Sequence, residues 1–338
     1  MRLIFFIVLL TCSRMADAQQ KPQYTQYLLN QYIINPALTG IENYTDIRLS
    51  HRQQWVGFTD APVTSYFTIH TPIGKKDTRV TPTSFDVTSK NPRDADFYDQ
   101  YQAAEPHHGV GLQIINDVTG PISRFSAYAT YAFHMGISAK TSIALGFAAG
   151  INNTSLNSDP LEFPEVTVDP AVYANGGQIE NFRPDMAAGL YLYSADFFAG
   201  LSALQVVPQK IKFADGVVGL IPGKQVPHMF LTAGYRFGAG ADWNFVPSVL
   251  VKYVSPVPVQ VDLNTKLQFR DLFWMGAGVR LNDGIMGMAG VNIARTVHVS
   301  YSYDYSTSEI NNYSKGTHEI ILGFILGKYG DSCPRHVW

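Results

Sequence analysis

The chain has 338 residues, of which 46% are hydrophobic, 13% are aromatic and only 15% are charged, with a formal net charge of -2. Folded soluble proteins usually carry roughly 25% charged residues, so much of the usual charged surface is missing. A near-neutral balance argues against nucleic acid as the main partner, because binding to phosphate needs an excess of basic residues. The composition also excludes collagen, disordered chains and disulfide scaffolds.

The first eighteen residues predict a secretory signal peptide. Arg2 precedes an apolar run at residues 3–10, as the charged and hydrophobic regions of such a peptide require. Ala16 and Ala18 then place small side chains at the -3 and -1 positions of a cleavage site before Gln19. We therefore expect an exported protein whose mature chain begins at Gln19.

The cysteines leave one alternative signal open. Cys12 follows two leucines and Thr11, an arrangement that resembles a lipoprotein signal, but threonine is a poor residue directly before a lipidated cysteine. After cleavage at the expected site, Cys333 is the single remaining cysteine. The mature chain therefore forms no intrachain disulfide, although export would permit one.

The rest of the chain contains no candidate transmembrane helix. A spanning helix needs about 20 mostly apolar residues, and Gly, Pro, Asn or a charge interrupts every apolar stretch before that length. Arg280 and Asp283 interrupt the best candidate. An exported chain of this kind is either a soluble all-β protein or an outer-membrane β-barrel.

Hydrophobicity alternates with a period of two residues along almost the whole chain. Between 259 and 269, apolar side chains alternate with Gln, Asp, Asn and Lys, which gives a strand with one apolar and one polar face. The pattern predicts about fourteen strands, an even number as single-chain bacterial barrels require. They lie at 45–55, 63–71, 109–117, 124–135, 141–151, 185–194, 196–206, 228–238, 246–254, 258–270, 272–281, 284–294, 297–304 and 320–326. Each is about as long as a tilted spanning strand.

The polar faces of these strands favour a barrel over a soluble sandwich. A sandwich carries charges outside, whereas a barrel turns its apolar face to lipid and encloses Gly, Ser, Thr and Asn. The Ser, Ala and Gly row within 142–150 suits a lumen wall better than a solvent face. Aromatic residues near the ends of the runs are candidates for interfacial girdles, with ordinary sheet aromatics as the alternative. The candidates are Trp55, Tyr66, Tyr131, Phe133, Tyr193, Phe237, Trp243, Tyr253, Phe273, Trp274 and Tyr305.

The connections predict an antiparallel up-and-down meander. Turn residues form short hairpin links at 117–121, 194–196, 238–242 and 282–284. Long polar links lie at 74–107, 152–183, 207–225 and 306–316. In outer-membrane barrels, short links are typical of periplasmic turns and long links are typical of extracellular loops.

Residues 19–44 stand outside the alternating pattern. Tyr24 and Tyr27 have the spacing of neighbours on one face of a helix, and Asn35 followed by Pro36 is expected to end that helix. We predict a short helical or coil segment that packs at the barrel mouth or in its lumen. A leader that packs on the periplasmic rim is the alternative.

Several charged residues fall at positions that point inward. Arg48 and Arg52 share the register of Ser50, opposite to apolar neighbours. The other expected inward charges are Lys252, Asp262, Lys266, Arg270, Asp304 and Glu319. Opposite charges then pair across the lumen, either to fix the barrel shape or to hold a plug segment or a cargo terminus. The candidate plug or partner contacts are Tyr24, Tyr27, Asn35, Pro36, Arg48, Arg52 and Trp55.

No motif points to catalysis or to a bound cofactor. The nine histidines are scattered without His-x-x-His spacing, and Cys-x-x-Cys is absent. His107 and His108 point to opposite faces of an extended chain, which favours a solvated loop end over a metal site. No nucleophile elbow, phosphate-binding loop or dinucleotide fingerprint occurs. We expect no enzyme and no cofactor or metal; a barrel hydrolase that uses Ser300 or Ser302 with His298 is the alternative.

Several blocks of sequence, among them those that follow, resemble the PorP/SprF family of the type IX secretion system. The opening blocks are PQYTQY at 22–27, NPALTG at 35–40 and RQQW at 52–55. Later blocks are LTAGYRF at 231–237 and YSYDY at 301–305. The first block is fairly specific, whereas strand blocks alone are shared by many barrels.

The resemblance implies a non-enzymatic protein of the bacterial outer membrane that assists the export or surface attachment of large cargo, such as gliding adhesins. Its expected partners are outer-membrane lipid, the C-terminal domain of the secreted cargo and other type IX components. A passive diffusion porin is the alternative function. We divide the chain into a signal peptide at 1–18, an N-terminal segment at 19–44, a barrel at 45–327 and a tail at 328–338.

Overall fold

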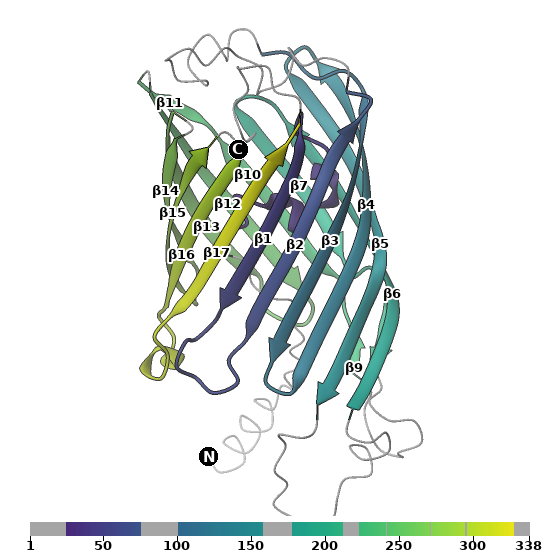
Figure 1. Ribbon diagram of the computed structural model, residues 1–338, viewed down its shortest axis with the longest axis vertical. Coiled ribbons are helices and arrows are strands. Elements are labelled where there is room, and N and C mark those ends of the chain that lie inside the picture. The colour runs from purple at the N-terminus through teal and green to yellow at the C-terminus, as the bar shows by residue number, and fades with distance from the viewer. Residues whose placement is uncertain are drawn as a thin grey trace, which may run out of the picture.

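The protein is an all-β barrel (Figure 1). The computed structural model describes residues 25–75, 101–157, 178–211, 223–240, 242–270, 272–294 and 296–327. The strands are β1 (Thr45–Gln53), β2 (Val63–Ile73), β3 (His107–Thr119), β4 (Ile122–Ser138), β5 (Thr141–Asn157), β6 (Gln178–Tyr193), β7 (Phe197–Leu204), β8 (Gln209–Ile211), β9 (Gly223–Gln225), β10 (His228–Tyr235), β11 (Phe237–Ala239), β12 (Trp243–Val254), β13 (Gln260–Phe269), β14 (Phe273–Arg280), β15 (Gly284–Ala294), β16 (Val297–Ser306) and β17 (Thr317–Leu326). The 3-10 helices are η1 (Gln31–Ile33), η2 (Pro36–Leu38) and η3 (Glu309–Asn312).

Antiparallel pairing closes the barrel. Each barrel strand pairs with the next along the chain, and β1 closes the circle by pairing with β17 from Thr45↔Leu326 to Gln53↔His318. β10 and β11 both pair with β12 and so form one strand that is interrupted at Arg236. The wall therefore has fourteen strands, while β8 and β9 form a separate small hairpin. The predicted up-and-down barrel is confirmed.

Side chains alternate between an exposed outer face and an enclosed lumen. In β13, Leu263 is 49% exposed, whereas its neighbours Asp262 and Asn264 are buried. In β5, Leu145 and Phe147 are exposed, while the small residues Ala144, Gly146 and Ala148 on either side of them are buried and face inward. A continuous apolar outer face is stable only in contact with lipid or another protein, and the polar interior matches a membrane barrel.

Four orientations differ from the sequence-based prediction. Tyr66, Tyr193 and Trp274 are buried in the lumen and are not girdle residues. The pairing explains this, because Tyr66 lies opposite the inward Ser50 and Trp274 opposite the inward Gln268. Arg270 is also not inward: it lies in an exposed turn, and its side chain pairs with Asp242. Tyr131, Phe237, Tyr253 and Tyr305 are exposed on the outer face, as expected.

The connections divide between two ends of the barrel, called the lower and upper ends as drawn in Figure 1. Strands β1, β3, β5, β7, β12, β14 and β16 end at the lower end, and the strands antiparallel to them end at the upper end. The link predicted at 74–107 therefore joins two upper strand ends, whereas the other long links join lower ones; residues 76–100, 158–177 and 212–222 lie outside the described residues. The predicted link 152–183 is also too long, because β5 continues to Asn157 and β6 begins at Gln178.

The N-terminal segment, residues 25–44, lies inside the barrel. Residues 25–42 are all buried, and their hydrogen-bond partners lie on strands from every side of the wall. The segment runs from Glu319 near the lower end to Gly109 near the upper end, where the chain turns into β1. Within the described ranges, no helix is long and apolar enough to span a membrane.

Candidate functional site

The lower end of the N-terminal segment is held by one buried carboxylate. Glu319 Oε2 accepts hydrogen bonds from the backbone N–H groups of Thr25 at 2.9 Å and Gln26 at 3.4 Å. Arg52 Nη1 lies 3.2 Å from the same oxygen and also donates to the Thr25 hydroxyl. The Thr25 hydroxyl in turn donates to Asp304. The start of the segment is therefore fixed to the wall by charge-assisted hydrogen bonds, which are stronger than neutral ones.

The middle of the segment crosses the lumen between opposite walls. The Asn264 side chain on β13 donates to the Tyr27 hydroxyl at 2.6 Å, whereas Gln113 on β3 donates to the Tyr32 carbonyl at 2.7 Å. Burial, and then the nearby Asp262 carboxylate, raises the pKa of Tyr27 above its usual value. These contacts tie the segment to both halves of the barrel.

Asn35 and Pro36 follow the end of η1 at Ile33 and begin a second helical turn, η2. The Asn35 side chain accepts from the backbone N–H of Ala37 as the N-cap of η2, and Pro36 occupies the first helical position. Both are favoured at those positions. The Asn35 amide also donates to the Leu190 carbonyl on β6 at 3.1 Å. The pair thereby fixes the segment to the wall of β5–β7.

Glycines on the wall leave room for this turn. A Cβ atom at Gly146 would overlap the backbone of Ala37, and one at Gly189 would overlap the Asn35 side chain. At the upper end, a Cβ atom at Gly109 would overlap the Thr39 carbonyl. Only glycine permits such a close approach of two backbones. These three residues define the glycine track on which the segment lies.

Three histidines surround the upper end of the segment. His134 Nε2 lies 2.8 Å from the Thr39 carbonyl, and the His134 ring stacks on His107 with centroids 4.6 Å apart. His70 Nδ1 accepts from the backbone N–H of Gly40 at 3.2 Å. In this arrangement His134 donates through Nε2–H, and His70 accepts through an unprotonated Nδ1. Both rings act as hydrogen-bonding partners of the segment.

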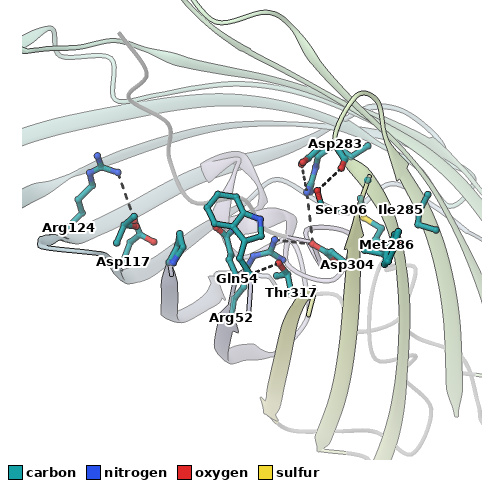
Figure 2. Close-up of a pocket in the computed structure, with 17 residues that line it drawn as sticks. Arg52, Gln54, Asp117, Arg124, Asp283, Ile285, Met286, Asp304, Ser306 and Thr317 are labelled. Carbon is teal, nitrogen blue, oxygen red and sulfur yellow. Dashed lines mark hydrogen bonds and ion pairs between the residues drawn. The ribbon is translucent and has the colours of Figure 1, made fainter. Parts of the chain in front are cut away.

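A cavity of about 370 Å³ opens beside the lower anchor (Figure 2). Its wall includes Arg52 and Asp304 on one side and Asp117 with Arg124 on the other. Trp55 also lines the cavity. Arg124 lies 3.9 Å from Asp117 and is about one-third exposed. Aromatic, cationic and anionic groups therefore meet at the lower mouth of the barrel.

The charged side chains at this mouth form one connected set, here called the mouth ion network. Arg52 lies 2.9 Å from Asp304 and 3.2 Å from Glu319. Arg280 lies 3.2 Å from Asp262, 3.4 Å from Asp283 and 4.0 Å from Asp304. The network thus links β1, β13, β14, β16 and β17 with the turn that follows β14.

The predicted contact residues fall in several places. Arg52 and Trp55 lie together at the cavity, whereas Tyr27 lies in mid-lumen. Arg48 forms an ion pair with Asp46 at 2.7 Å. Asn35 and Pro36 lie against the far wall. Tyr24 lies outside the described residues.

Sequence reasoning missed the roles of Thr25 and Gly146. No local sequence pattern marks Thr25 as an anchor. Its contacts are with Glu319 and Asp304, which lie nearly 300 positions later in the chain. Gly146 was visible only as part of a small-residue lumen row, and alternation does not reveal which segment lies against it. In the described part of the chain, no cluster of three or more His, Cys, Asp or Glu residues is placed to hold a metal ion.

A closed antiparallel barrel with an apolar outer face and a polar, filled lumen defines the class: a β-barrel of the bacterial outer membrane. The family profile described as type IX secretion system membrane protein PorP/SprF matches residues 16–324, so the chain belongs to this family. No curated protein matches the chain.

Solved outer-membrane proteins share the fold. The toluene transporter TbuX of Ralstonia pickettii superposes with a TM-score of 0.50 at 8% identity, covering 88% of this chain and 93% of that chain. A Pseudomonas aeruginosa FadL homologue gives a TM-score of 0.47 at 10% identity, covering 95% of this chain and 96% of that chain. At these identities the likeness concerns the fold alone. The family is that of a type IX secretion system membrane protein, and membership implies association with membrane lipid and with secretion components.

Proposed function

We propose that this barrel is a non-enzymatic docking subunit that assists the export or surface attachment of large cargo proteins, such as gliding adhesins. It does so by binding the cargo C-terminal domain or another type IX component. The observation that carries this proposal is the filled lumen, because the buried segment at 25–42 occupies the path that a diffusing solute would take. A filled barrel acts through its ends and its outer wall.

The lower mouth is the favoured docking end. It combines Trp55 with the half-exposed Phe58 and with Arg124, and aromatic residues and arginine are the residues enriched in protein interfaces. The lower end also carries most of the long connections, which in outer-membrane barrels are usually extracellular. A partner at the cell surface would therefore meet this end first.

Affinity purification from detergent-solubilised outer membranes tests the proposal. The tagged wild-type barrel should recover a cargo C-terminal domain or a type IX component. Trp55→Ala and Arg124→Gln should recover less, while Lys140→Ala, in the exposed turn at the upper end, serves as the matched control. Recovery of no such protein by wild type, together with normal adhesin export in a deletion strain, would contradict the proposal.

The passive diffusion porin is tested with the same preparation. Liposomes that contain an open porin swell in sugars smaller than the pore. The filled lumen predicts swelling close to that of empty liposomes. Rapid swelling with wild-type protein would favour the porin over a docking subunit.

A further inference from the structure

The lower cavity has a balanced lining of positive and negative groups. Three arginines and three aspartates line it, and each aspartate forms an ion pair with one of the arginines. The pairs are Arg124–Asp117 at 3.9 Å, Arg280–Asp283 at 3.4 Å and Arg52–Asp304 at 2.9 Å. Because these charges are balanced pair by pair, the lining gives little net attraction to an ion of either sign.

The same side chains supply hydrogen-bond donors and acceptors to the cavity. A guanidinium group only donates and a carboxylate only accepts. The Arg124 side chain is 36% exposed and the Asp283 side chain is 39% exposed, and the two lie on opposite sides of the cavity (Figure 2). A hydroxyl group both donates and accepts, and its hydrogen bonds to charged partners are stronger than those to neutral ones. A neutral ligand with several hydroxyl groups is therefore suited to this lining.

Trp55 adds an aromatic surface to the cavity on an unusual backbone. Its φ angle is 45°, in the left-handed region that a bulky residue rarely adopts. The backbone N–H of Trp55 donates to the Thr317 hydroxyl at 3.2 Å, and that of Val56 donates to the Gly316 carbonyl at 2.8 Å. Such conformations persist where the surrounding structure fixes them, and they cluster at ligand sites. The backbone of Trp55 thus gives an independent indication of a binding role.

We propose that the lower cavity binds a neutral carbohydrate, with a pyranose ring on the indole of Trp55 and its hydroxyl groups bonded to Asp283 and Arg124. A pyranose ring has an apolar C–H face that packs on an aromatic side chain, while its edge carries the hydroxyl groups. The cavity volume of about 370 Å³ lies within the range of small-molecule sites, which combine apolar and aromatic surface with a few placed polar groups.

The carbohydrate site goes beyond the proposed docking of a protein partner. The two roles share Trp55 and Arg124, whereas Asp283 belongs to the carbohydrate site alone. Asp283→Leu should therefore abolish carbohydrate binding and leave the recovery of a cargo domain or type IX component unchanged. Because carbohydrate binding is measured on the purified barrel without a protein partner, the two proposals fail separately.

A glycan array tests the binding site. The barrel is purified in an oxyethylene detergent, since glycoside detergents carry sugar head groups, and it should bind members of a set of neutral glucose, galactose and mannose oligosaccharides. Trp55→Ala should weaken this binding about tenfold, through loss of the stacked ring. Tyr313→Ala is the matched control, because Tyr313 is an exposed aromatic residue outside the cavity lining. Binding to none of the neutral glycans, or unchanged binding by the folded Trp55→Ala variant, would overturn the proposal.

Competition identifies the source of the carbohydrate. A soluble saccharide and a polymer on the cell surface present the same ring and hydroxyl chemistry. Displacement of the bound array glycan by polysaccharide extracted from the cell surface would identify a polymer, and displacement only by free oligosaccharides would identify a soluble sugar. Either result supports the carbohydrate site.

Variants of Asp283 and the dependence on salt test whether the ligand is neutral. Asp283→Asn keeps a hydrogen-bond acceptor and removes the charge, so the affinity for the glycan should fall only a few-fold, whereas Asp283→Leu should abolish binding. The affinity should be the same at low and high NaCl, because salt does not screen a neutral ligand. Heat-modifiable migration on gels verifies that each variant folds. Equal losses in the two variants, or loss of binding at high NaCl, would show that charge recognises the ligand and would overturn the proposal.

Discussion

Glu319 couples the wall of the barrel to the N-terminal segment. Its side chain is fully buried, and the same oxygen receives Arg52 and the backbone of Thr25 and Gln26. A buried carboxylate is stable only when its lone pairs are satisfied, and removal of one partner of a buried ion pair leaves the other uncompensated. This residue therefore links barrel stability to the position of the N-terminal segment.

Glu319→Gln should destabilise the barrel by about 1.5–3 kcal/mol, because it removes one of the two buried carboxylates that pair with Arg52 and leaves Asp304 as the other. Chemical unfolding in detergent or lipid measures the free energy. Limited proteolysis should show faster cleavage near Thr25. If the variant has the wild-type free energy of unfolding and the wild-type rate of proteolysis, Glu319 does not anchor the N-terminal segment.

Asp242→Asn is the matched control at an exposed pair. Hydrogen bonding to Arg270 holds the pKa of Asp242 below its usual value. A carboxyl group of this kind stabilises the folded state at pH values above its pKa in the unfolded chain. This contribution is lost as the pH falls through its lower pKa in the folded protein. Both side chains are solvent-exposed, so the substitution should change stability little at neutral pH. A loss as large as that of Glu319→Gln would refute the distinction between the two pairs.

Leu263 tests the membrane-facing surface. It is 49% exposed near the middle of β13, so Leu263→Arg should cost about 2–4 kcal/mol if this face contacts lipid. Leu263→Cys should react with a lipid-soluble probe and be shielded from a water-soluble one. Asn264→Arg is not a mild comparison, because Asn264 is buried and bonded to Tyr27. Asn264→Cys should be shielded from both probes, and equal shielding at Leu263 would indicate a protein core.

At the element scale, the N-terminal segment and the strands of its wall are complementary in shape. The backbone of η2 lies directly on β5 and β6, because Gly146 and Gly189 carry no side chain. Gly287 on β15 gives a contrast, since an added Cβ atom there meets nothing within 4 Å. The close approach is therefore local to the glycine track.

Gly146→Leu should displace η2 from the wall, because the added side chain overlaps the backbone of Ala37. The expected results are faster proteolysis of residues 25–40 and a higher ion conductance. Gly287→Leu, at a strand glycine with open space, should leave both unchanged. Equal behaviour of the two variants would show that the glycine track does not hold the segment.

The sequence predicted the strands well but not the contacts between distant segments. Period two identified all fourteen strands, since each buries one face and exposes the other. It did not orient Tyr66 or Trp274, because an aromatic residue suits either a girdle or a filled lumen. It also did not place Asn35 on β6, since that contact joins positions 155 residues apart.

At the scale of the whole molecule, the order of connections determines what each end presents. The N-terminal segment starts at the lower end, rises through the lumen and turns into β1 at the upper end, so chain direction alone places Thr25 beside the lower cavity. The site residues come from β1, β16 and β17, which closure of the barrel brings together. The alternating sequence pattern identifies the strands but not which strands pair across the ends of the chain. The closure by β1 and β17 is therefore seen only in the structure.

Single-channel conductance tests whether the barrel is closed by its own N-terminal segment. The purified protein in planar bilayers should conduct far less than a variant that lacks residues 20–38, provided that heat-modifiable migration shows both to be folded. The deletion should open the lumen because it removes most of the buried segment. High conductance of the wild-type protein, or equally low conductance of the folded deletion variant, would contradict the account.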